Sequence, residues 1–97
     1  MDNNKYLKIL KIIYGYYGID ESGFVKLLKN RDKKFLILLV LKNNNFLESS
    51  DLINIFGINS VSKMKRTIKS AEEKFLVNSF FRKDYVELEE KIKKQID

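Results

Sequence analysis

The chain has 97 residues, enough for one small domain with its own hydrophobic core. It carries 19 Lys and Arg residues against 13 Asp and Glu residues, and its net charge of +6 favours a polyanionic partner. Cysteine and histidine are absent, which excludes disulfides, thiolate or imidazole metal sites and histidine-based catalysis. The four glycines lack the spacing of a phosphate-binding loop. We therefore expect neither an enzyme nor a bound cofactor.

Residues 5–17 predict a helix that is apolar over most of its circumference. Lys5, Lys8 and Lys11 form one polar seam, and apolar or aromatic side chains cover the rest. Such a helix must be buried on more than one side, so we expect one side to face the core and another to face a second copy. The predicted homodimer contact consists of Tyr6, Ile9, Leu10, Ile13, Tyr16 and Tyr17. The alternative is that the amphipathic segment 20–29 folds back over this helix within one chain.

Residues 35–41, FLILLVL, are all apolar. This run is too short to cross a bilayer, which takes about twenty residues. Charged and amide residues flank it, so we expect a fully buried helix, the first of a three-helix core, with Asp32 as its cap. A buried strand is the alternative. Lysines interrupt the apolar positions near the N-terminus, which therefore does not look like a secretory signal, and we expect a cytoplasmic protein.

A short helix and a glycine turn are predicted before residue 60. The helix has four closely spaced apolar residues that must pack on a core, and three residues ahead of it can cap its start. Gly57 tolerates the positive φ that a tight turn between helices requires. Asn59 or Ser60 can then cap the next helix. The apolar residues are Leu52, Ile53, Ile55 and Phe56, and the capping residues are Ser49, Ser50 and Asp51.

The second helix has one apolar face and one basic face. Its apolar residues recur at steps of three and four, which places them on one stripe toward the core: Val61, Met64, Ile68, Ala71 and Phe75. The opposite face suits a DNA major groove, because it offers cations for phosphates and polar donors for base edges. The predicted DNA-binding residues here are Asn59, Ser60, Ser62, Lys63, Lys65, Arg66, Lys69 and Ser70. A solvated lysine-rich surface is the alternative.

Two short β-rich runs are predicted after the second helix. Residues 78–81 form the first strand, residues 82–84 a charged turn, and residues 85–88 the returning strand. Residues 89–96 then form a short terminal helix. Arg82 and Lys83 in the turn either reach a DNA phosphate or are plain turn residues.

This order of elements resembles the winged helix-turn-helix domains of the MarR and ArsR types. The run RTIKSAEEKFLV, followed by YVELEEKIKK, is similar to their recognition helix, wing and returning strand, although Phe75 stands where they usually have glycine and the wing is shorter. The resemblance implies a mainly α fold with a small β-hairpin wing. Residues 1–30 would be extra N-terminal helices for dimerisation, and residues 31–97 would hold the helix-turn-helix core, wing and terminal helix.

The resemblance implies a homodimer that binds double-stranded DNA, with two possible roles. One is a small transcriptional repressor. The other is a centromere-binding adaptor of plasmid or phage partition, similar to the TubR adaptors that work with a filament-forming motor. The alternative is a protein-interaction adaptor without DNA binding, whose contact patch would be Phe80, Phe81 and Tyr85. Salt separates these activities, because only binding through phosphates weakens steeply as salt rises.

Overall fold

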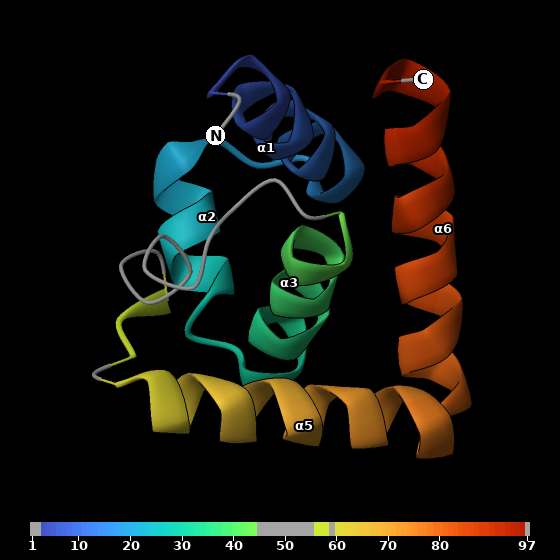
Figure 1. Ribbon diagram of the computed structural model, residues 1–97. Helices are drawn as coiled ribbons and strands as arrows, with labels where there is room; N and C mark the ends of the chain where they lie inside the picture. Colours follow the sequence, from blue (N-terminus) through green and yellow to red (C-terminus); the bar gives the residue numbers. More distant parts are fainter. Residues whose placement is uncertain (1–2, 45–55, 59, 97) are drawn as a thin grey trace.

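The computed structural model describes residues 3–44, 56–58 and 60–96, and no strand occurs among them. The helices are α1 (Asn3–Tyr17), α2 (Glu21–Leu27), α3 (Arg31–Asn43), α5 (Val61–Val77) and α6 (Ser79–Ile96). Figure 1 shows α5 along one edge of the molecule and α6 rising steeply from its end, with α3 inside the angle between them. Helix α1 lies on the side of α3 away from α5. None of the described helices is long and apolar enough to span a membrane.

Helix α3 is the centre of the core. All seven residues from 35 to 41 are buried, and α3 packs against both α5 and α6. The expectation of a buried helix is therefore confirmed, and the strand alternative is wrong. The predicted cap is also wrong, because Asn30 caps the helix and accepts a hydrogen bond from the Lys33 amide at 3.1 Å. Asp32 instead pairs with Lys74 of α5.

Helix α1 packs one face against the core of its own chain. Ile9 and Ile13 have no exposed surface, and α1 packs along α6. From the other side, the ring of Phe24 in α2 meets Tyr14 edge to face, with 5.6 Å between the ring centroids. Ile9 and Ile13 therefore belong to the core and not to a dimer surface, which corrects the prediction for these two residues. Leu10, Tyr16 and Tyr17 are half-buried, and the Tyr6 side chain lies outside those described.

The predicted β-hairpin wing is wrong, because residues 79–96 form the single helix α6. Asn78 caps this helix, and its side-chain oxygen accepts a hydrogen bond from the Phe81 amide at 2.9 Å. The inward residues of α6 recur at steps of four, three and four, which is the spacing of one helical face: Phe81, Tyr85, Leu88 and Ile92. Burial of this face against α1, α3 and α5 outweighs the β-propensity of the aromatic residues.

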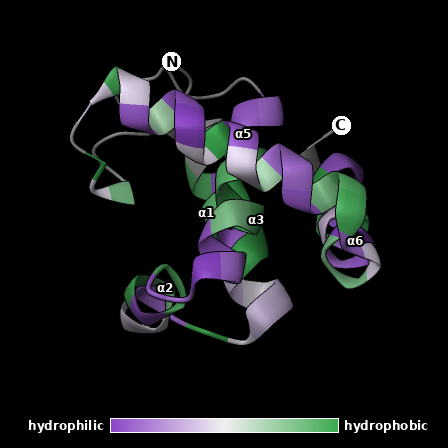
Figure 2. Cartoon of the chain, turned by 90° about the horizontal axis from the view of Figure 1, so that it is seen from below, coloured by the Kyte–Doolittle hydropathy of each residue, from purple (hydrophilic) through white to green (hydrophobic). Residues whose placement is uncertain are grey.

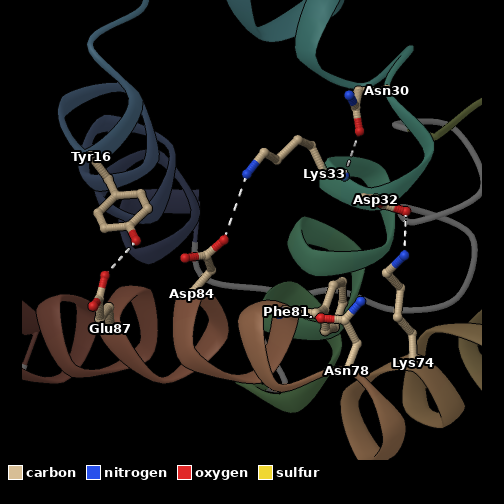
Figure 3. Close-up of polar contacts among 9 residues, drawn as sticks. All are labelled: Tyr16, Asn30, Asp32, Lys33, Lys74, Asn78, Phe81, Asp84 and Glu87. Atoms are coloured by element: carbon tan, nitrogen blue, oxygen red, sulfur yellow. Dashed lines mark hydrogen bonds and ion pairs between the residues drawn. The ribbon is translucent and has the colours of Figure 1, made fainter.

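Polar contacts join α6 to its neighbours at the rim of the core (Figure 3). The Tyr16 hydroxyl donates a hydrogen bond to Glu87 Oε2 at 2.9 Å, and Lys33 Nζ lies 3.8 Å from Asp84 Oδ2. Burial of the Tyr16 hydroxyl, together with its hydrogen bond to Glu87, raises its pKa to about 12. Burial likewise raises the pKa of Tyr17.

We expect the fold to lose stability at alkaline pH through Tyr16. Because the pKa of Tyr16 is about 12 when folded and 10.0 in its unperturbed state, its contribution is complete below pH 10 and is lost as pH rises through 12. The free energy of unfolding, measured with urea at a series of pH values, should therefore fall over this range. Tyr16→Phe should show a shallower fall, and an equal fall in both proteins would contradict this role.

Candidate nucleic-acid interface

The turn before α5 is built on Gly57, which has a φ of +65°. The predicted positive φ is confirmed. Phe56 and Ile58 on either side of it are both buried, and they anchor the turn to the core. The rest of the helix predicted at residues 52–56, its caps at residues 49–51 and the candidate contact Asn59 lie outside the described residues.

Ser60 begins α5. Its hydroxyl oxygen accepts a hydrogen bond from the Lys63 amide at 3.1 Å, so Ser60 serves as the N-cap that the sequence allowed. Of the predicted inward stripe, Met64 and Ala71 are buried, and Ile68 and Phe75 are partly buried against the core. Val61 at the start of the stripe is half exposed. The stripe therefore fixes which face of α5 turns outward.

The outward face of α5 holds the predicted DNA-binding residues. Ser60 and Ser62 are exposed, as are Lys63, Lys65, Arg66 and Lys69, and Ser70 is partly exposed. At 100° per residue, Ser62, Arg66 and Lys69 run along the centre of this face, with Lys63 on one flank and Lys65 on the other. Figure 2 looks onto α5 from outside the molecule and shows its N-terminal half largely hydrophilic.

A shallow hollow of about 440 Å³ lies between this face and the glycine turn. Lys63, Arg66, Thr67 and Ser70 line it from α5, Gly57 and Ile58 from the turn, and Phe35 from α3. Two cations beside the Ser70 hydroxyl match the needs of a phosphate group. The sequence reasoning missed Thr67, although it follows Lys63 by one helical turn and its hydroxyl donates to the Lys63 carbonyl at 2.8 Å.

The charges of α5 are unequal along its length. Residues 61–71 contain Lys63, Lys65, Arg66 and Lys69 and no acidic residue. In the described part of the chain, no ion pair joins these four cations to an acidic side chain. In the C-terminal half, by contrast, Glu72 pairs with Lys42 at 3.7 Å and Lys74 with Asp32. Positive charge is therefore concentrated at the end of α5 beside Gly57.

Arg82 and Lys83 do not form a wing. Arg82 Nη1 donates hydrogen bonds to the carbonyls of Phe75 at 2.9 Å and Leu76 at 3.1 Å, so it caps the C-terminal end of α5. Lys83 is exposed on the second turn of α6. Because α6 starts at the C-terminal end of α5, both residues are remote from the basic end (Figure 1). The alternative that they are plain turn residues is wrong, because both lie in α6, and a contact of either residue with a DNA phosphate stays a prediction.

Arg82→Ala should therefore lower stability rather than DNA affinity. Loss of two charge-assisted hydrogen bonds at a partly exposed helix end costs about 1 kcal/mol. Urea unfolding measures that loss, and titration of a labelled duplex measures affinity. Lys83→Ala is the matched control and should change neither quantity. A large loss of affinity in Arg82→Ala with unchanged stability would return this residue to the DNA contact.

The described residues contain no group of three or more acidic side chains arranged to hold a metal ion. The basic end of α5 remains the strongest candidate site, and its chemistry is that of anion recognition. No protein-family model matches the chain, and no similar protein was found among the curated proteins or the solved structures.

Proposed function

We propose that the chain binds duplex DNA, with the N-terminal half of α5 in the major groove. The observation that carries this proposal is the positive charge of residues 61–71, whose four cations pair with no acidic side chain among the described residues. The first turn of α5 has no acidic residue, although the positive end of the helix dipole favours one there. Lys63 lies in that turn instead. A cation there lowers the stability of the helix but adds positive charge to the surface. Such a conflict between local stability and charge is typical of functional sites.

The layout of the face gives each side chain a role. An α-helix about 10–12 Å wide fits the B-DNA major groove, which is about 12 Å wide. Ser62, Arg66 and Lys69 at the centre of the face would meet base edges, and a guanidinium there suits the two acceptors of guanine. Lys63 and Lys65 on opposite flanks would meet phosphates on the two strands that border the groove.

The salt dependence of binding tests this proposal. Each neutralised phosphate contributes a slope of about −0.9 to log K against log salt, so the two phosphate contacts of Lys63 and Lys65 would give about −1.8 for one copy. Fluorescence anisotropy of a labelled duplex at several salt concentrations measures the slope. Lys93→Ala/Lys94→Ala removes two exposed cations from the end of α6 and should leave the slope unchanged. A flat salt dependence of the unmodified chain would refute DNA binding through phosphates.

Repression at an operator and centromere binding in partition would both use this DNA-binding activity. The protein-adaptor alternative has less support, because its expected aromatic patch does not form. Phe81 is buried, and Tyr85 is half-buried with its hydroxyl accepting a hydrogen bond from Asn43 at 2.8 Å. Of the three predicted residues, only Phe80 is widely exposed.

A further inference from the structure

A second shallow hollow, of about 400 Å³, adjoins the one beside the glycine turn. Phe35 and Ser70 line both hollows. The first extends along α5 from Lys63 to Ser70, and the second from Ser70 to Val77. Lys63, Ser70 and Lys74 follow one another at steps of seven and four residues, which places them on one flank of the helix. The two hollows therefore follow each other along this flank, and we call them together the α5 groove.

Arg31, the first residue of α3, lies on the opposite side of the α5 groove. Its side chain is exposed and lines the second hollow. The guanidinium carbon lies 5.3 Å from the centroid of the Phe35 ring, which is close enough for attraction between the cation and the ring. Because Phe35 lines both hollows, this contact holds the charge of Arg31 near the boundary between them.

Arg31 determines the charge of the second hollow. Its other charged residues are Asp32, Glu73 and Lys74, of which Asp32 and Lys74 pair with each other. In the part of the chain that the structure describes, no ion pair joins Arg31 to an acidic side chain. Without Arg31, the unpaired carboxylate of Glu73 would leave the second hollow negative and repel a phosphate. With Arg31, this hollow is neutral, and the two cations of the first hollow make the whole α5 groove positive.

We infer that Arg31 binds a backbone phosphate of the same DNA strand that Lys63 contacts, so that this strand follows the α5 groove to the start of α3. The inference rests on the proposed function and adds a contact from a second helix. A guanidinium donates paired hydrogen bonds to phosphate oxygens, and phosphate contacts fix the orientation of a protein on the duplex. A contact from α3 would limit rotation of α5 about its own axis within the major groove.

The salt dependence of duplex binding tests this contact. Arg31 adds a third phosphate contact to those of Lys63 and Lys65, which changes the expected slope of log K against log salt from about −1.8 to about −2.7. Arg31→Gln should return the slope to about −1.8, whereas Arg31→Lys keeps the charge and should keep the steeper slope. Lys11→Gln is the matched control, because it removes one exposed cation from α1, which lies on the side of α3 away from α5 (Figure 1). Fluorescence anisotropy of a labelled duplex measures all four slopes.

The outcomes separate this inference from the proposed function. An Arg31→Gln slope equal to that of the unmodified chain would overturn the inference and leave the proposed function in place. Equal losses of slope in Arg31→Gln and Lys11→Gln would also overturn it, because the charge of Arg31 would then act without a defined contact. A flat slope of the unmodified chain would overturn both. A purely structural role of Arg31 on Phe35 would lower the free energy of unfolding in urea without changing the slope, so urea unfolding of the same proteins distinguishes that role.

Discussion

Lys83→Pro should destabilise the folded chain by about 3 kcal/mol or more. Lys83 lies on the second turn of α6, where proline removes a backbone hydrogen bond and its ring collides with the preceding turn. A small domain has a total stability of about 5 kcal/mol or somewhat more, so this variant should lose roughly half of its stability and unfold at a much lower urea concentration. Urea unfolding followed by far-UV circular dichroism measures the loss.

Ser79→Pro is the matched control. Ser79 is the first residue of α6, and Asn78 before it has the extended conformation that precedes proline readily. Ser79→Pro should therefore be nearly neutral. A β-hairpin with its turn at residues 82–84 would give the reverse order, since proline is tolerated in a turn and disfavoured within a strand. A Lys83→Pro protein as stable as the parent would contradict α6.

Lys63→Ala/Arg66→Ala should weaken duplex binding by about 2–4 kcal/mol, or roughly 30- to 1,000-fold in Kd. Both side chains are exposed and lie off the inward stripe of α5, so the core is untouched. Removing a cation from the first helical turn should leave the melting temperature equal or slightly raised. Anisotropy titration and thermal denaturation of the same preparation measure the two effects.

Lys93→Ala/Lys94→Ala provides the control for charge alone. It also removes two positive charges, but from the end of α6. Its affinity for the duplex should stay close to that of the unmodified chain. Equal affinity of the Lys63→Ala/Arg66→Ala protein and the unmodified chain would exclude α5 as the recognition element. A comparable loss in both double variants would instead indicate a diffuse attraction without a defined face.

The parts of the fold that were predicted correctly have local causes. A run of seven apolar residues predicted the buried helix α3. The steps of three and four between Met64, Ile68 and Ala71 predicted the inward face of α5. The positive φ of Gly57 follows from the geometry of a tight turn between helices. Each of these features is determined by residues within one or two helical turns of each other, so the sequence pattern was enough to show it.

Helix α6 was missed because its first turns have strand-like and turn-like residues. Asn78 was placed in a strand but is a helix cap, and Arg82 was placed in a turn but binds the end of α5. The helical spacing of Phe81, Tyr85 and Leu88 was present in the sequence and could have identified the helix. What covers α1 was harder to predict, because the covering residues on α6 are distant in sequence.

The packing of α1 on α6 also sets when the chain can fold during its synthesis. Ile9 and Ile13 leave the ribosome early, whereas Leu88 and Ile92, in the last described helix, follow about 80 residues later. At about 5–20 residues per second, the apolar face of α1 lacks its contacts with α6 for several seconds. During that interval the nascent chain exposes the kind of surface that chaperones bind and that promotes aggregation. Formation of the complete core therefore depends on the arrival of α6.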